Sequence, residues 1–257
     1  MLTLTLALVA VIAALVVDAV GRRRTTASLE RRLAVAAHDL EGLQRAFARF
    51  APARVVEDIA QGREPVPARK DVTVLFADLR GFTPLAERLE PGVLVEVLNG
   101  WLRRMSAVLS VHQGHTAKFI GDGIMALFGA LEPNPWQTND AAHAALAMRT
   151  ALTEYNSVLA IAGMPTLAMG IGIHRGAVTA GVLGSADLVE YGVVGSTVNV
   201  AARVERLTRT HGVDVLVTTD VAEALDRRFR LEPMPAATVK GLTIPLVTHA
   251  LRGFDEA

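Results

Sequence analysis

The chain of 257 residues contains no cysteine and carries no net charge, with 26 basic and 26 acidic residues. The absence of cysteine excludes disulfide frameworks, zinc sites built from thiolates and cysteine nucleophiles. The charge balance provides no overall attraction for a polyanion, so no nucleic-acid partner is expected. Internal repeats and low-complexity tracts are also missing. Apolar residues, by contrast, make up 51% of the chain, which is enough to bury a sizeable core in one or two domains.

The N-terminal segment is the most apolar part of the chain. Residues 2–20 include a single charge, Asp18, and as a helix they would span roughly 28 Å, about the thickness of a bilayer core. Arginines at 22–24 follow this run and no basic residue precedes it, the reverse of a secretory signal peptide. The positive-inside rule therefore predicts a single-pass anchor at 1–21 in the inner or plasma membrane, with the rest of the chain cytoplasmic. A cleaved leader and a buried helix of a soluble protein are the alternatives.

Apolar residues next recur with heptad spacing, in alternating steps of four and three residues. These positions are Leu29, Leu33, Ala36, Leu40, Leu43, Phe47 and Phe50. The narrow seam favours a parallel two-stranded coiled coil, with an ordinary amphipathic helix as the alternative. We expect this coiled coil and a short helix after Pro52 to occupy residues 22–61. Residues 62–70, rich in proline and charge, are expected to form a linker.

From residue 71 onward, predicted strands and helices alternate. A strand is expected over Val72–Asp78, followed by helices from Pro84 and over 92–112. Two apolar runs within 115–129 meet at Gly121-Asp122-Gly123, which predicts a hairpin. The remaining elements expected are a helix at 139–160, strands at 167–174, 177–183 and 188–194, a helix at 196–211 capped by Ser196, and a strand at 245–251. This order predicts an α+β sheet with helices packed on it.

Two carboxylates at strand ends are the first candidates for chemistry. Asp78 closes the first strand and Asp122 lies at the hairpin tip, so both reach one sheet edge if these strands are neighbours. Two carboxylates there can hold two divalent ions for in-line displacement at phosphorus. The turn after Asp78 contains Gly81, Phe82 and Thr83 and leads into a helix start, where backbone N–H groups can cradle phosphate. Each signal alone is weak, because an aspartate before a glycine is most often a turn former.

Five sequence strings, taken in order, carry a family resemblance. They are LFADLRGFT, KFIGDGIMALFG, GIGIHRGAVTAGVLG, YGVVGSTVNVAAR and VKG. Together they resemble the catalytic domain of class III adenylyl and guanylyl cyclases, over residues 71–252. The resemblance implies a ferredoxin-like βαββαβ domain that converts a nucleoside triphosphate into a 3′,5′-cyclic nucleotide and pyrophosphate. It also implies two Mg²⁺ or Mn²⁺ ions per active site and a homodimer with shared sites, which the coiled coil would hold together.

The same resemblance assigns roles to individual residues. Asp78 and Asp122, with the backbone carbonyl of Leu79, match the metal ligands, and Lys240 matches the lysine that grips the terminal phosphates. From the partner subunit, Lys118 would bind the purine, while Asn199 would orient the ribose. Arg203, one helical turn after Asn199, would stabilise the transition state. His174 is expected to be structural, and Trp101 and Phe119 to lie in the core or in an interface.

One position departs from the family pattern and bears on the substrate. Gly192 stands where adenylyl cyclases usually carry an aspartate or threonine that accepts a hydrogen bond from the adenine amino group. Lys118 nevertheless argues for ATP, because guanylyl cyclases usually have glutamate at that position. We therefore expect an adenylate cyclase that acts in intracellular signal transduction. A guanylate or base-relaxed cyclase and a low-activity, nucleotide-binding pseudocyclase are the alternatives.

Overall fold

The structure is a computed structural model that describes residues 31, 33–35, 37–38, 61, 66–184, 189–238 and 245–255. Two compact units make up the chain, Met1–Glu64 and Pro65–Ala257. In the first unit the described residues between 31 and 38 are helical, and Leu33, a heptad position, is 69% exposed in the single chain. The predicted membrane segment and most of the predicted coiled coil lie outside the described residues. Among the helices that are described, none combines the length and apolar character needed to cross a membrane.

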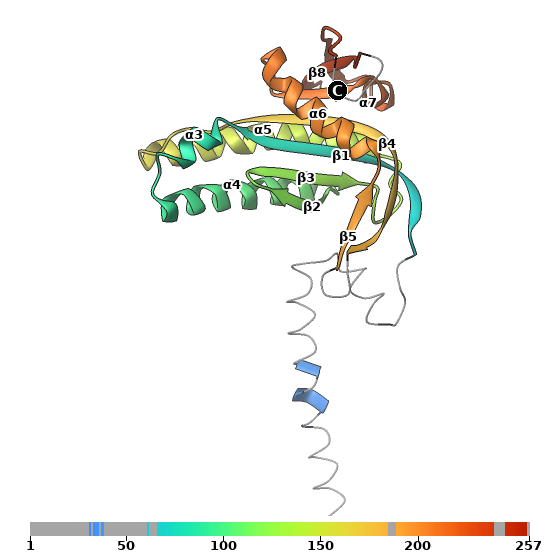
Figure 1. Ribbon diagram of the computed structural model, residues 1–257, viewed down its shortest axis with the longest axis horizontal. Helices are drawn as coiled ribbons and strands as arrows, with labels where there is room; N and C mark the ends of the chain where they lie inside the picture. The colour runs from blue at the N-terminus through green and yellow to red at the C-terminus, as the bar shows by residue number, and fades with distance from the viewer. Residues whose placement is uncertain are drawn as a thin grey trace, which may run out of the picture. The chain divides into compact units, whose positions relative to one another are not determined.

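The second unit is an α+β domain built on one mixed sheet (Figure 1). Its elements are β1 (Ala68–Arg80), α3 (Phe82–Ala86), α4 (Pro91–Val111), β2 (His115–Ile120), β3 (Gly123–Phe128), α5 (Gln137–Ile161), β4 (Ala168–Gly184), β5 (Val189–Val194), α6 (Ser196–His211), β6 (Val215–Thr218), α7 (Thr219–Ala224), β7 (Phe229–Pro233) and β8 (Thr248–Phe254). The strand order is β2-β3-β1-β4-β6-β8-β7, with β5 paired to β4. β4 and β6 run parallel, and the other pairs are antiparallel. The α+β expectation is therefore confirmed.

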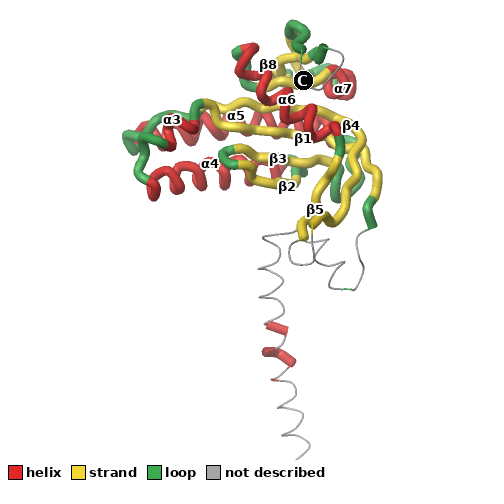
Figure 2. The backbone as a smooth tube through the Cα atoms, in the orientation of Figure 1, coloured by secondary structure: helices red, strands yellow, loops and turns green. Residues whose placement is uncertain are grey.

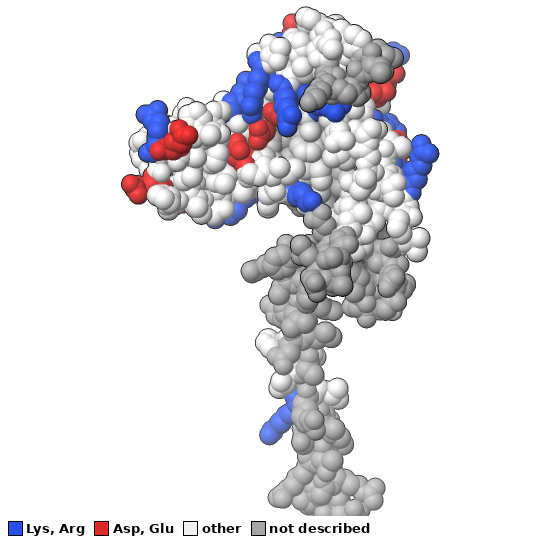
Figure 3. All heavy atoms as spheres, in the orientation of Figure 1, with Lys and Arg blue, Asp and Glu red and all other residues white. Residues whose placement is uncertain are grey.

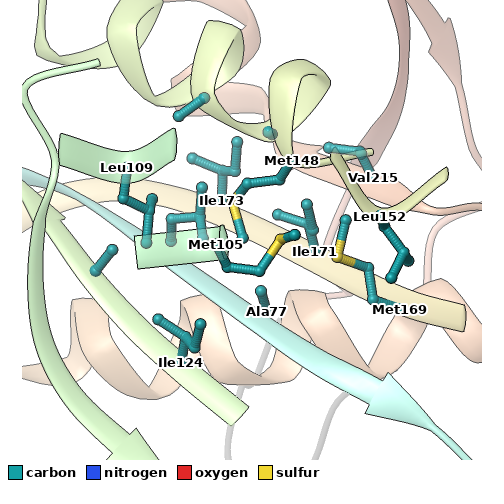
Figure 4. Close-up of a cluster of buried hydrophobic side chains, with 14 of the residues drawn as sticks. Ala77, Met105, Leu109, Ile124, Met148, Leu152, Met169, Ile171, Ile173 and Val215 are labelled. Atoms are coloured by element: carbon teal, nitrogen blue, oxygen red, sulfur yellow. The ribbon is translucent and has the colours of Figure 1, made fainter. Parts of the chain in front are cut away.

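Strand β1 has a different environment on each face because successive side chains of a strand point in opposite directions. Leu75, Ala77 and Leu79 are buried in the main core with α4 and α5. Figure 4 shows part of this core, in which Met105 and Met148 lie close to Ile171 and Ile173 of β4. Residues of the other parity, from Val72 through Val74 to Asp78, face the side covered by α6 (Figure 2). Asp78 is thus directed toward α6.

Glycines in β4 allow α6 to lie directly against the sheet. Gly172 faces α6, and a Cβ at this position would lie 2.1 Å from the backbone nitrogen of Glu205. Gly170, which pairs with Asp78, leaves similar room for the side chains of Glu205 and Thr208. Ile171 and Ile173, which alternate with these glycines, are fully buried in the main core. In the sequence MGIGI, the glycines therefore face α6 and the isoleucines face the core on the other side of the sheet.

Several local expectations need correction. The strands expected at 167–174 and 177–183 form one continuous strand, β4, because Arg175 and Gly176 pair with β1 like their neighbours. Helix α6 has Gly195 at its N-cap, so Ser196 is not the cap; the hydroxyl of Thr197 instead donates to the Ala177 carbonyl (2.7 Å).

Trp101, Phe119 and His174 were expected to have structural or interface roles rather than catalytic ones. Trp101 is fully buried in the core, and Phe119 on β2 is 52% exposed in the single chain, so an interface position remains the prediction for it. His174 Nδ1 lies 2.9 Å from Thr218 Oγ1, and burial lowers the pKa of the imidazole, which fits a structural role.

Candidate active site

The two predicted metal ligands lie at the same edge of the sheet. Strand β1 pairs with β3, with Ala77 opposite Ile124, so the end of β1 adjoins the turn that joins β2 and β3. Asp122 belongs to this turn, and the neighbouring Gly123 lies so close that a Cβ would be 3.0 Å from Asp78 Oδ1. Burial, together with the negative charge of Asp122, raises the pKa of Asp78. The structure therefore brings the two carboxylates together.

A cationic nitrogen from the last turn of α6 already contacts this edge. Arg209 Nη2 donates to Asp78 Oδ2 at 2.7 Å and lies 3.4 Å from the Leu79 carbonyl oxygen. The guanidinium opposes the rise in the pKa of Asp78, as does the charge of Arg206. Figure 3 shows basic side chains directly beside acidic ones in this part of the surface. The carboxylate and the carbonyl thus converge on one positive charge.

This arrangement suits a hard divalent cation. Mg²⁺ and Mn²⁺ prefer oxygen ligands, and here a carboxylate oxygen and a backbone carbonyl face a common point, with Asp122 close by. Asp78, Leu79 and Asp122 are the residues that would hold such ions. Within the described residues, no group of three or more histidine or acidic side chains forms a metal site by itself.

A third carboxylate, Glu205, lies beneath this edge without being placed as a ligand. Its residue is 4% exposed, and burial and the negative charge of Asp78 raise its pKa to about 7. Glu205 Oε1 and the hydroxyl of Thr208 are buried and have no hydrogen-bond partner within the described part of the chain. Arg80, Arg206 and Arg209 partly oppose the rise in the pKa. Glu205 is thus an ionisable group that the fold keeps close to the metal edge.

Asn199 and Arg203 lie on α6 but are directed away from this edge. At about 100° per residue, they share a helix face with Arg206, opposite the buried face formed by Val200, Val204 and others. Asn199 is exposed and Arg203 is partly exposed. Of the described arginines on α6, Arg206 and Arg209, rather than Arg203, shift the pKa of Asp78. One chain therefore does not bring Asn199 and Arg203 together with its own metal ligands.

Of the residues expected to recognise the base, Gly192 is also separated from Asp78 within one chain. Lys118 is exposed on the outermost strand β2. Gly192 is buried in β5 opposite Gly181, eleven residues along β4 from the partner of Asp78, or roughly 36 Å of extended strand. A Cβ at Gly192 would lie 3.1 Å from Leu183 Cδ1. Lys240, expected at the terminal phosphates, lies outside the described residues.

The expected phosphate cradle follows directly after the metal ligands. Gly81 caps α3 with φ of +69°, a left-handed conformation that glycine adopts without strain. Phe82 packs against the main core, and Thr83 is exposed. The helix begins at Phe82 rather than near Pro84, so the turn between Asp78 and the helix is shorter than expected.

Glu205 and Arg209 were not among the residues predicted from the sequence. Glu205 recurs with the buried positions Thr197, Ala201 and Thr208 along α6, so a carboxylate on the apolar face of an amphipathic helix was the available signal. Arg209 lies four residues later, in the last turn before Gly212 ends the helix. Its contact with Asp78 depends on how α6 crosses β1, which local pattern does not specify.

Comparison with known proteins gives one consistent result. The family model described as "Adenylate and Guanylate cyclase catalytic domain" matches residues 65–253. An adenylate cyclase of Anabaena cylindrica is 34% identical over 81% of this chain and 42% of its own length, and adenylate cyclase 1 of Rhizobium meliloti is 29% identical over 74% and 28%. The chain thus spans less than half the length of these curated relatives.

Solved structures agree with the sequence relatives. The crystal structure of the guanylyl cyclase Cya2 is 34% identical, with a TM-score of 0.70, and the match covers 74% of this chain and 95% of Cya2. The adenylyl cyclase CyaB of P. aeruginosa is 26% identical, also with a TM-score of 0.70, over 74% of this chain and 97% of CyaB. The domain formed by β1–β8 is therefore common to enzymes named for either nucleotide.

Proposed function

The chain belongs to the adenylate and guanylate cyclase catalytic domain family, and we propose that it is an adenylate cyclase that forms 3′,5′-cyclic AMP and pyrophosphate from ATP in intracellular signal transduction. The observation that carries the proposal is the edge where Asp78, Leu79 and Asp122 meet. A carboxylate oxygen of Asp78 and the carbonyl oxygen of Leu79 both contact one cationic nitrogen there, and oxygen donors of this kind are the ones that Mg²⁺ and Mn²⁺ prefer.

In the proposed reaction, different residues act on the ribose and on the triphosphate of the substrate. Two divalent ions bound between Asp78 and Asp122 would supply Lewis acidity at the 3′-hydroxyl and at the triphosphate. The 3′-oxygen attacks the α-phosphorus in line, its proton passes to water or to a phosphate of the substrate, and pyrophosphate leaves. By family resemblance, Asn199 orients the ribose, Arg203 meets the charge that develops on the phosphorus oxygens, and Lys240 holds the terminal phosphates. The contribution of Arg203 is electrostatic and depends on its orientation before the reaction.

The directions of the site residues support a homodimer with shared active sites. Asn199 and Arg203 project from the face of α6 opposite its buried side, away from the metal ligands of the same chain. In a two-fold dimer, each metal edge would face the Asn199, Arg203 and Lys118 of the other subunit, giving two equivalent sites. The predicted coiled coil at 22–61 would raise the effective concentration of the two domains.

The choice of ATP rests on Lys118, and Gly192 supports a second candidate. Glycine offers no side chain to accept a hydrogen bond from the adenine amino group, and Gly192 is itself buried in β5. Loss of a hydrogen bond that separates two substrates reduces discrimination. A cyclase that also accepts GTP is therefore the second proposal, in keeping with the similarity to the guanylyl cyclase Cya2.

The location of the enzyme is part of the proposal. The apolar run at 2–20, followed by arginines at 22–24, supports a single-pass anchor in the inner or plasma membrane with the catalytic domain in the cytoplasm. ATP is available on that side of the membrane.

Product analysis of the full-length chain with Mn²⁺ and either ATP or GTP tests the function. We expect cyclic AMP from ATP, slower cyclic GMP formation from GTP, and at least about a hundredfold loss of both in Asp78→Ala, because an ion site loses a ligand. Asp71→Ala serves as the matched control, since Asp71 lies on the same strand and pairs with the partly exposed Arg175. The proposal would be contradicted if neither substrate gave a cyclic nucleotide, or if Asp78→Ala kept full activity.

A further inference from the structure

Arg209 has a second acidic neighbour besides Asp78. Glu205 lies four residues earlier on α6, the spacing at which a glutamate and a following basic residue are neighbours on a helix surface. The positive charge of Arg209 acts on Glu205 as well as on Asp78. Arg209 therefore has two carboxylates near it, and its hydrogen bond is to Asp78.

The two carboxylates differ in what they already bind. Asp78 Oδ2 accepts the hydrogen bond from Arg209, and the nearby Leu79 carbonyl contacts the same nitrogen. Glu205 Oε1 is buried and has no hydrogen-bond partner among the described residues. A buried carboxylate oxygen without a partner is unfavourable, so a donor that moved toward Glu205 would remove an existing deficit.

A divalent ion and Arg209 cannot both occupy the same oxygen atoms. The nitrogen of Arg209 lies where Asp78 Oδ2 and the Leu79 carbonyl would bind metal. Arg209 is half exposed, so its side chain is free to move, whereas the strand end that carries Asp78 and Leu79 is fixed by pairing with β4. Metal binding at this edge therefore requires the arginine, rather than the ligands, to change position.

We propose that Arg209 is the resident counter-cation of the metal edge, which competes with divalent ions for Asp78 and Leu79, and that Glu205 accepts Arg209 when a metal displaces it. Arg209 is thus a positioning residue that orients the Asp78 carboxylate before metal binding and lowers the metal affinity. This inference rests on the proposed function, because it assumes that the edge binds catalytic metal.

The test measures Mn²⁺ binding directly, from the electron paramagnetic resonance signal of free Mn²⁺ in titrations of the full-length protein at pH 8 without nucleotide. Arg209→Gln is expected to lower the dissociation constant about fivefold or more, because it removes both the charge and the hydrogen bond. Arg206→Gln is the matched control. Arg206 acts on Asp78 through charge, and its removal should change the constant by about twofold at most. Equal constants for wild type and Arg209→Gln, or no measurable binding by either, would overturn the proposal.

Glu205→Gln tests whether Glu205 accepts the displaced Arg209. If Glu205 accepts the displaced arginine, this variant weakens Mn²⁺ binding several-fold in the wild-type background and much less when combined with Arg209→Gln. An equal effect in both backgrounds would show that Glu205 acts as a simple negative charge, and the acceptor role would be wrong. Cyclic AMP formation is measured on the same samples. If the Mn²⁺ dissociation constants shift but no product forms, the proposed function is refuted and the role of Arg209 is not. If product forms normally but the dissociation constants do not shift, the role of Arg209 is refuted and the proposed function is not.

Discussion

The buried carboxylate of Glu205 makes the stability of the domain depend on pH in a specific direction. In the folded protein its pKa is raised to about 7, from an ordinary value of 4.5, chiefly by burial. The folded state therefore binds a proton that the unfolded state has lost between these two pH values, so the free energy of unfolding falls as pH rises through this window. The shift of roughly 2.5 pH units corresponds to about 3 kcal/mol.

Glu205→Gln removes this ionisation while keeping nearly the same volume in the buried site. We expect the variant to gain about 3 kcal/mol of unfolding free energy relative to wild type on going from pH 4.5 to pH 8. Urea denaturation of the full-length protein in EDTA, followed by tryptophan fluorescence at both pH values, measures this difference. Glu154→Gln, an exposed position on α5, is the control and should show no such change. A difference between Glu205→Gln and wild type that stays constant with pH would show that the pKa of Glu205 is not raised by folding.

Two further predictions concern glycines. Gly192→Asp should raise the ratio of ATP to GTP turnover several-fold by restoring an acceptor for the adenine amino group, with the Leu183 side chain moving a few tenths of an ångström to make room; an unchanged ratio in competition assays would show that the base is recognised elsewhere. Gly172→Ala should lower the unfolding free energy by at least about 2 kcal/mol, because its Cβ meets the Glu205 backbone; Gly92→Ala, in open space on α4, should be neutral or slightly stabilising, and equal melting temperatures for both variants would contradict the packing described for α6.

Much of the catalytic domain was predictable because its local patterns agree with its tertiary structure. The Val72–Asp78 strand, the hairpin around Gly121 and the helix that ends before Gly212 each carry periodicity and turn signals that the fold uses directly. Two strands were predicted where the structure has the single strand β4, because Arg175 and Gly176 resemble a turn locally. Their pairing with β1 across the sheet overrides that local preference. Ser196 resembled a cap, but the chain enters α6 one residue earlier.

In the candidate site, too, some contacts could be predicted from the sequence and others could not. Asp78 and Asp122 could be paired from sequence because both follow strand ends, and strand neighbours share an edge. The contact of Arg209 with Asp78 could not, because it depends on the line along which α6 crosses Gly170 and Gly172. That crossing is a property of packing between residues far apart in the chain, and no local spacing encodes it.

Cyclic nucleotide formation at a site to which two copies of this chain contribute is tested most directly by mixing two inactive variants. Asp78→Ala removes a proposed metal ligand and Arg203→Ala removes the arginine proposed to stabilise the transition state, so each homodimer should be inactive with ATP and Mn²⁺. After denaturation and joint refolding, half the dimers are mixed and each carries one intact site, so about a quarter of wild-type cyclic AMP formation should return. A mixture that stays as inactive as its components, while wild type refolded in the same way regains activity, would contradict the shared site.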